Sequence, residues 1–213
     1  MKKVLVLSSL FALGAAASFG SVAPPPACST QSVATIAEGY TCEIGDKIFS
    51  NINTDGAPTT GTISFNGSGT LYTLDFNNFS APITTAFTFS FNVAVDTITN
   101  PSNRIIQVQD QMLTSNTTGA SLPNNTTAVV THTPGGIVNL SGASPDGHTQ
   151  NGVANMLTTN EGVSFAFTPG ANGQLADVSF IISQTTVPEP VSLSLTGLGL
   201  LGLGFFGRRR LKS

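Results

Sequence analysis

The sequence predicts an all-β protein, an antiparallel β-sandwich of jelly-roll or immunoglobulin-like kind, and three observations support this prediction. Within the segment from Ala86 to Val95, one face carries Phe87, Phe89, Phe91, Val93 and Val95 and the other carries Thr88, Ser90 and Asn92, which is the pattern of a strand with one buried face. Other short apolar segments are separated by Gly, Pro and Asn, the residues that favour turns. Between the two ends of the chain, no segment has the spacing of an amphipathic helix. Short strands at such intervals favour two packed sheets.

The individual strands follow from the same signals. Two apolar runs flank Asn66-Gly67-Ser68-Gly69 within residues 61–76, which predicts a hairpin whose turn lies at these four residues. Gly45-Asp46 is a turn signal, and the residues after it suit a strand. Ser, Thr and Asn are enriched over residues 114–127, which predicts a long exposed loop. Further strands are predicted at residues 104–113, 128–133, 162–167 and 177–186.

The N-terminus has the layout of a secretory signal peptide. Lys2 and Lys3 precede an apolar run from Val4 to Leu13, and small residues follow. The apolar run is too short for a permanent membrane anchor, which is the alternative interpretation. We therefore expect residues 1–20 to be a signal peptide, the chain to be exported across the inner membrane, and residues 28–186 to form the β-sandwich ectodomain.

The C-terminus, residues 187–213, combines three elements in a fixed order. Pro188, Glu189 and Pro190 form an extended border, because proline disfavours helix in itself and in the residue before it. An uncharged apolar segment, 191–206, follows; as a helix it would reach about 24 Å at about 1.5 Å per residue, against a hydrocarbon core of about 30 Å. Arginines at 208–210 then favour a cytoplasmic end. The segment is short and rich in glycine, so we expect it to hold the chain in a membrane only transiently; a permanent single-pass anchor is the alternative.

This terminal arrangement resembles the PEP-CTERM sorting signal of Gram-negative bacteria. The resemblance implies that exosortase, a membrane protease-transpeptidase, is a partner, and that it recognises the segment and removes it. It also implies delivery to the cell envelope or to an extracellular matrix rich in exopolysaccharide, as in a biofilm. A second segment, CEIGDKIF from Cys42 to Phe49, resembles a signature near the mature N-terminus of many such proteins, and implies a structural role in fixing the first strand. The residues that carry the sorting resemblance are Pro188, Glu189, Pro190, Arg208, Arg209 and Arg210.

The two cysteines, Cys28 and Cys42, both lie in the part that we expect to be exported. In an oxidising compartment, two cysteines predict a disulfide. A lipid-modified Cys28 is disfavoured, because Pro25, Pro26 and Ala27 precede it where a lipoprotein signal needs Leu and small residues. A metal site would need more Cys or His nearby. We therefore predict a Cys28–Cys42 disulfide, no metal site and no cofactor.

The charge distribution excludes some partners. Six of the 8 basic residues lie in the two terminal segments, so only Lys47 and Arg104 remain against the 11 acidic residues, which gives the exported part a net charge of −9 if Glu189 is kept. Such an acidic surface argues against nucleic acid and against anionic lipid as partners. We expect contact with the membrane only through the C-terminal segment; extracellular polysaccharide is a further partner that the PEP-CTERM resemblance implies.

No catalytic motif is present in the ectodomain sequence. His132 and His148 are the two histidines available as general bases, and no Gly-x-Ser-x-Gly pattern accompanies them. Asp146, Glu161 and Asp177 are candidate paired carboxylates of a glycosidase, but they lie in separate segments. We therefore predict no catalytic residues and no enzymatic activity.

Two function hypotheses remain. The first is an exported surface or matrix protein without enzymatic activity, processed by exosortase and associated with exopolysaccharide. The second is a secreted glycan-binding module or glycoside hydrolase on a β-sandwich scaffold. The chain has 14 Phe and no Trp, and this composition weakens the second hypothesis, since carbohydrate-binding modules commonly stack sugars on Trp or Tyr.

Overall fold

The structure, a computed structural model, describes residues 23–77, 79, 81–116, 125–142 and 148–187. The predicted signal peptide, 1–20, lies outside the described residues. So do the sorting residues Pro188, Glu189, Pro190, Arg208, Arg209 and Arg210 and the apolar segment 191–206. These assignments therefore stay predictions. Within the described ranges, no helix is long and apolar enough to cross a membrane.

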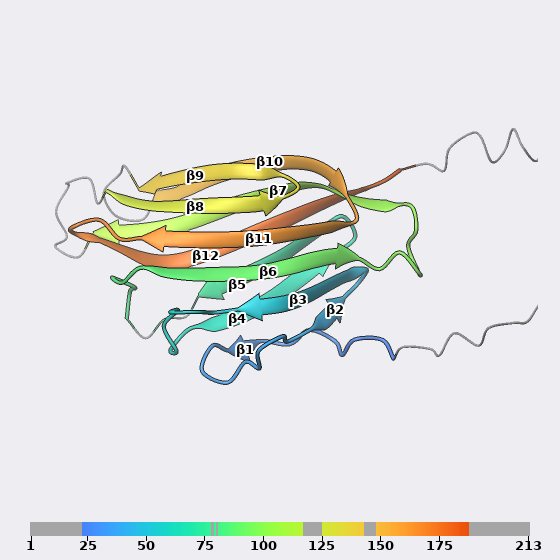
Figure 1. The fold of residues 1–213 in the computed structure, drawn as a ribbon, viewed down its shortest axis with the longest axis horizontal. Helices are drawn as coiled ribbons and strands as arrows, with labels where there is room; N and C mark the ends of the chain where they lie inside the picture. Colours follow the sequence, from blue (N-terminus) through green and yellow to red (C-terminus); the bar gives the residue numbers. More distant parts are fainter. Residues whose placement is uncertain (1–22, 78, 80, 117–124, 143–147, 188–213) are drawn as a thin grey trace, which may run out of the picture.

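The described part of the chain is all-β and forms two six-stranded antiparallel sheets, as the sequence predicts. Sheet A has the order β2-β3-β6-β11-β8-β9, and sheet B has the order β1-β4-β5-β12-β7-β10. Figure 1 shows sheet A in front of sheet B. The strands are β1 Gln31–Ser32, β2 Cys42–Ile44, β3 Lys47–Asn53, β4 Thr62–Ser68, β5 Leu71–Asn77, β6 Phe87–Val95, β7 Asn103–Asn116, β8 Thr126–Thr133, β9 Gly136–Gly142, β10 His148–Thr158, β11 Asn160–Thr168 and β12 Gly173–Thr186.

Phenylalanine rings from both sheets form the layer between them. Phe89 and Phe91 of β6 and Phe165 of β11 point inward from sheet A, and all three surround Phe180 of β12 in sheet B, with ring centroids 6.0, 5.1 and 6.0 Å from its ring. Each of these rings is at most 1% exposed. Burying one such side chain contributes about 1.5–3 kcal/mol, so this layer is the main attraction between the two sheets.

The alternation predicted from Ala86 to Val95 is confirmed. In β6 the five apolar side chains are buried and the residues between them are exposed or half-buried. The hairpin predicted over residues 61–76 also forms, as β4 and β5, but its turn lies at Gly69-Thr70, because the ladder continues through Ser68 paired with Leu71. Gly69 has a φ of 64°, the left-handed backbone that glycine adopts most readily. The predicted turn position is therefore wrong by about two residues.

The predicted disulfide between Cys28 and Cys42 is confirmed. Two backbone hydrogen bonds accompany it: Cys28 N–H donates to Glu43 O at 2.9 Å, and Glu43 N–H donates to Pro26 O at 2.8 Å. The disulfide closes a loop of 14 residues, and a constraint of this size stabilises a fold by about 3 kcal/mol. The segment before β2 is thereby fixed to the edge of sheet A.

The turn between β2 and β3 lies within the CEIGDKIF segment. Gly45 has a φ of 62°, and a Cβ at this position would lie 2.6 Å from the hydroxyl oxygen of Tyr72. Asp46 and Lys47, which follow, are both buried. Close approach to β5 and the left-handed backbone both require glycine here, which explains the residue at position 45.

The described segment begins and ends at the same end of the sandwich (Figure 1). At this end, Val187 N–H donates to Ser102 O at 2.8 Å, which ties the end of β12 to the loop before β7. The β2–β3 turn lies here as well, since Asp96 N–H donates to Asp46 O at 2.8 Å. A segment that continues beyond Val187 therefore leaves from the end that holds the CEIGDKIF turn.

We predict that Gly45→Ala destabilises the fold by about 2–4 kcal/mol, because it combines backbone strain with a clash against Tyr72. Gly69→Ala is the matched control: its φ is 64°, and nothing lies within 4 Å of the added Cβ, so only the backbone cost of about 1 kcal/mol applies. Urea denaturation of both variants measures the difference. Equal losses in the two variants would show that the contact with Tyr72 contributes nothing.

Candidate functional site

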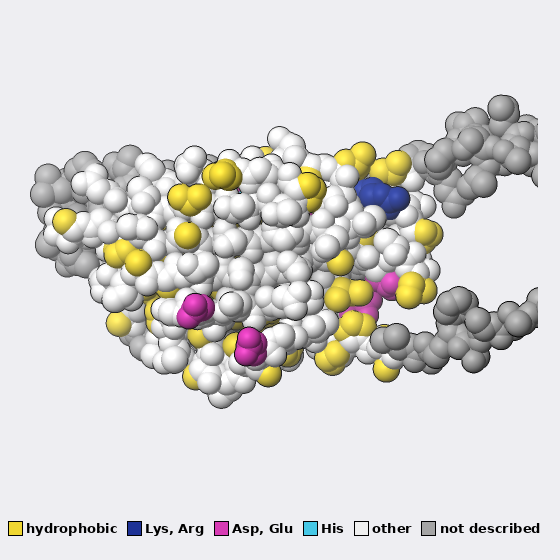
Figure 2. Space-filling model, in the orientation of Figure 1, with side chains coloured by type: hydrophobic (Ala, Val, Ile, Leu, Met, Phe, Trp, Pro, Cys, Tyr) yellow, Lys and Arg dark blue, Asp and Glu magenta, His cyan; other side chains and the backbone are white. Residues whose placement is uncertain are grey.

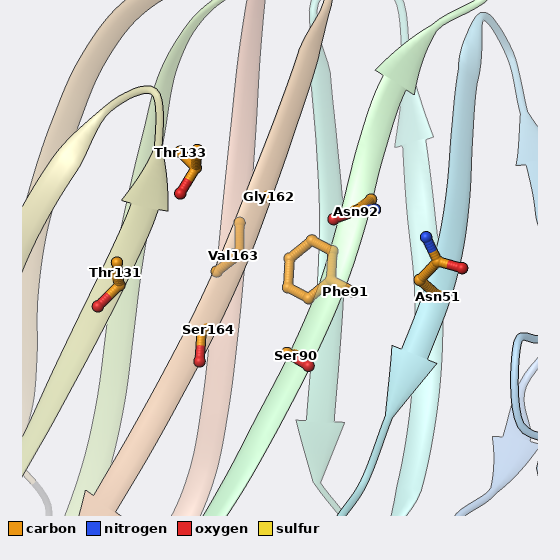
Figure 3. A pocket seen from close by; sticks show the side chains of 9 residues that line it. All are labelled: Asn51, Ser90, Phe91, Asn92, Thr131, Thr133, Gly162, Val163 and Ser164. Carbon is orange, nitrogen blue, oxygen red and sulfur yellow. The ribbon is translucent and has the colours of Figure 1, made fainter.

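A shallow depression of about 260 Å³ lies on the outer face of sheet A. Figure 3 shows its side chains on four neighbouring strands: β3, β6, β11 and β8. In Figure 2 the middle of this face is white, and the few charged side chains lie toward its margins. The lining residues are Asn51, Ser90, Phe91, Asn92, Thr131, Thr133, Gly162, Val163 and Ser164.

The strand register builds the depression in two rows across the sheet. In the first row, Ser164 lies between Ser90 and Thr131. In the second row, Gly162 lies between Asn92 and Thr133. Neighbouring strands are about 4.8 Å apart, so the first row presents a hydroxyl group at each such interval, whereas the second presents side-chain groups only on its two outer strands. Gly162 has no side chain, which leaves the middle of the second row hollow.

Asn51 forms the wall of the depression on the β3 side. The register between β3 and β6 shifts between Ser50 and Asn53, and Asn51 has a φ of 51°. Asparagine tolerates this left-handed backbone better than other residues with a side chain. The irregularity in β3 therefore directs an exposed amide to the rim of the depression, beside Asn92 of β6 (Figure 3).

The depression has hydrogen-bonding groups but no group for acid–base chemistry. Its outward-facing side chains carry hydroxyl and amide groups, and none of its lining residues is titratable. The side chains of Phe91 and Val163 are at the buried positions of their strands and are only 1% and 2% exposed, so the depression has no exposed aromatic ring among its lining residues. Such a surface suits an uncharged ligand that carries many hydroxyl groups, held by hydrogen bonds rather than by stacking.

A second hollow, of about 410 Å³, is lined by Ile36, Glu38, Ile52, Asn53, Thr54 and Asp55. It contains two carboxylates, but the side chains of Glu38 and Asp55 are both exposed to solvent. A glycosidase acid needs a pKa raised by burial or by a close like charge. Solvent exposure removes the first of these causes, so this hollow gives little support to hydrolysis.

Of the three carboxylates considered from the sequence, the two that the structure describes lie in different sheets. Asp146 lies outside the described residues, Glu161 is fully buried in β11, and Asp177 lies in β12 of the other sheet. Burial and the nearby charge of Asp75 raise the pKa of Asp177 to about 6. The charges that shift the pKa of Glu161 come from His132 and Asp110, and the charge that shifts the pKa of Asp177 comes from Asp75, so Glu161 and Asp177 do not act as a pair.

His132, the first of the two histidines, lies in a polar cluster between the sheets. Its Nε2 is 2.9 Å from Asp110 Oδ2 of β7, and its Nδ1 is 3.3 Å from Glu161 Oε1 of β11. The three side chains are at most 1% exposed. His148, the second histidine, is the first residue of β10. Because the cluster is closed to solvent, no substrate can reach it, and its role is structural.

Burial dominates the electrostatics of this cluster. It raises the pKa of Asp110, and the hydrogen bond and charge of His132 offset only part of the effect. It also raises the pKa of Glu161, where the charge of His132 and the N–H of Gly135 act in the opposite direction. Among the described residues, no group of three or more His, Cys, Asp or Glu side chains is arranged to hold a metal ion.

The sequence contained a signal for this cluster. In β8, Ala128, Val130 and His132 are buried in alternation with exposed residues, so the strand predicted at residues 128–133 already placed His132 on its apolar face. In β7, Asp110 stands at the buried position between Val108 and Met112. A charged residue at a position where the alternation of a strand predicts a buried apolar side chain indicates a buried polar partner.

Comparisons with known proteins do not assign the chain to a family. No family model matches the chain, and no curated protein is similar to it in sequence. Among solved structures, a CBM35 from Cellvibrio japonicus Abf62 aligns over 75% of this chain and 99% of its own length, with 15% identity and a TM-score of 0.30. At this level the match carries no argument about fold or function.

We predict that Glu161→Gln changes how stability depends on pH. A carboxyl group whose pKa is raised on folding binds more protons in the folded state than in the unfolded state, so the free energy of unfolding falls as the pH rises. For Asp110 and Glu161 this fall begins near their ordinary pKa values, 3.8 and 4.5, and ends above their raised pKa values in the folded protein. The carboxamide of the variant cannot ionise, so the free energy of unfolding of the variant relative to wild type should be higher at pH 7 than at pH 4.

Denaturant titrations at the two pH values measure this difference. Glu38→Gln, at an exposed position, is the control and should have the same effect on stability at both. A Glu161→Gln variant whose stability relative to wild type is unchanged, or lower, at pH 7 would contradict the interpretation.

Proposed function

We propose that this chain is an exported, non-enzymatic protein of the cell envelope or extracellular matrix, and that it associates with extracellular polysaccharide through the depression on sheet A. Exosortase would process it at the segment that begins with Pro188, Glu189 and Pro190. The observation that carries the binding proposal is the hollow row of hydroxyl and amide groups on an uncharged sheet face. A glycan-binding module, the second hypothesis from the sequence, would use the same surface.

We further infer that the sandwich is a jelly roll. Strands β5 to β12 occur in the orders β5-β12-β7-β10 and β6-β11-β8-β9. In these orders, sequence neighbours such as β5 and β6 lie in different sheets, and the last strand lies beside the first of the eight. This is the double-sheet arrangement of eight strands in two Greek keys. The strands β1 to β4 extend it along one edge.

The charge of the ectodomain limits the polysaccharide to an uncharged one. The predicted mature domain has a net charge of −9, and the lining of the depression has no basic residue to bind an anion. Like-charge repulsion disfavours an acidic polymer at such a surface. The volume of about 260 Å³ is below the common range of about 300–1,000 Å³ for ligand pockets, so each contact is weak and a long polymer would bind through many copies.

Three features support export and sorting. The Cys28–Cys42 disulfide suits an oxidising compartment. The two terminal segments have the layouts of a signal peptide and of a sorting signal. The last strand, β12, ends at Thr186, shortly before Pro188, and both ends of the described segment lie at one end of the sandwich (Figure 1). A domain held by its C-terminal segment would therefore present the faces of its sheets, rather than its tethered end, to the surroundings.

Processing is tested by the intact mass of the envelope-associated protein, from cells with and without a working exosortase. We expect the mass of a chain that lacks residues 1 to about 20 and the C-terminal segment after Pro190 in the first case, and a chain that retains this segment in the second. The same mass in both strains, with residues 191–213 present, would contradict the sorting proposal.

Polysaccharide binding is tested by native electrophoresis of the mature protein in gels that contain dextran, hydroxyethylcellulose or alginate. We expect the two neutral polymers, but not the anionic alginate, to retard the wild type. Ser164→Arg fills the depression from its middle strand and should weaken retardation about tenfold, a change of about 1.4 kcal/mol.

Asn139→Arg adds the same charge to β9 at an exposed position outside the depression, and it should leave the retardation unchanged. If no neutral polymer retards the wild type, or if both arginine variants lose retardation equally, the depression is not the binding site.

A further inference from the structure

Lys47, the single lysine of the ectodomain, is buried at the start of β3. Its side chain is 0% exposed, and its ammonium nitrogen lies 4.6 Å from the centre of the Tyr72 ring. The Nζ atom is 2.8 Å from Asp46 Oδ1 and also contacts the amide oxygen Oε1 of Gln184. A buried lysine amine thus lies between a carboxylate and a carboxamide inside an apolar sandwich.

Gln184 comes from the other sheet and is held in place. The register of β12 against β7 shifts between Ser183 and Gln184, and Gln184 is paired with the buried Ile105. Its side-chain Nε2 donates to Gly69 O at 2.6 Å. With the amide nitrogen held by the β4–β5 turn, the carbonyl side of the carboxamide faces Lys47.

The surroundings make the Lys47 amine easier to deprotonate than an exposed lysine. Burial lowers the pKa of Lys47, and the hydrogen bond and charge of Asp46 offset only part of this effect. A neutral, desolvated lysine amine is a nucleophile. Holding it against a carbonyl group removes most of the entropic cost of a reaction between two separate groups.

We propose that Lys47 and Gln184 form an intramolecular isopeptide bond. The Lys47 Nζ attacks Gln184 Cδ, a new N–C bond forms, and the Cδ–Nε2 bond breaks. The products are a secondary amide between the two side chains and one molecule of ammonia. The atoms balance without an oxidant, a reductant or any other reactant, and this modification is independent of the proposed binding function.

Asp46 is positioned to move the proton that this reaction requires. Its Oδ1 contacts the attacking nitrogen, and its Oδ2 accepts a hydrogen bond from Asn103 Nδ2 at 2.8 Å. Burial raises the pKa of Asp46, but hydrogen bonds from Lys47, Asn103 and Tyr72 outweigh it and hold the pKa below its ordinary value. The carboxylate takes a proton from the attacking amine and delivers it to the departing amide nitrogen, which leaves as ammonia.

The isopeptide bond would link the two sheets covalently at the end of the sandwich where β12 ends. It joins β3 of sheet A to β12 of sheet B, close to Val187, the last described residue. A pull on the C-terminal segment would pass from β12 directly into β3. The covalent link would then prevent the two sheets from separating at this end.

The intact mass of the full chain, purified under reducing and denaturing conditions, tests the proposal. We expect a mass lower than the sequence value by one ammonia, and a protease digest that contains one peptide pair joined through Lys47 and Gln184. Lys47→Met removes the nucleophile and Asp46→Asn removes the proton carrier; both variants should have the full mass of their sequences.

A wild-type chain of full mass overturns the proposal, whether or not the variants fold. So does an ammonia loss that persists in Lys47→Met or that maps to other residues, since asparagine side chains can also lose ammonia. Loss of ammonia in Asp46→Asn at the wild-type rate overturns the role of Asp46.

Discussion

The contact between Phe180 and the rings of sheet A is the interaction on which the rest of the structure depends. One ring from β12 packs against Phe89, Phe91 and Phe165, and each of those residues belongs to a strand that alternates strictly. Because side chains on a strand point to opposite faces in turn, burying these rings also decides which residues face outward. A shift of one residue in β6 or β11 would bury hydroxyl groups and expose rings.

The proposed binding surface is the outer face of sheet A, opposite the face that carries the phenylalanine rings. Ser90 and Asn92 alternate with the buried rings of β6, and Gly162 and Ser164 do so in β11. The same chain segment therefore supplies the attraction between the sheets and a row of uncharged hydrogen-bonding groups on the surface. The two buried polar clusters, around His132 and Lys47, lie inside the sandwich and act on its stability and on its covalent structure rather than on the surface.

The sequence predicted those parts of the fold that local patterns determine. The alternation of β6 and the turn at Gly45 are each visible within a few residues, and the pairing of Cys28 with Cys42 follows because the chain has two cysteines. The depression was not predicted, because it depends on the register that brings Asn51, Ser90, Thr131 and Ser164 side by side from four strands. The partners of Lys47 were not visible either, since Gln184 is 137 residues away in sequence. Strands β9 and β10 were missed because apolar alternation in them is interrupted by Asn, Gln and Gly.

The central claim is that the phenylalanine layer joins the two sheets into one cooperative unit and makes sheet A a rigid platform. Amide hydrogen exchange of the mature protein, followed residue by residue in denaturant, tests it most directly. The account predicts that the central amides of β6, β11, β5 and β12 exchange with one common free energy, equal to that of global unfolding. Exchange of sheet A at a clearly lower free energy than sheet B would contradict it, because the sheets would then open separately.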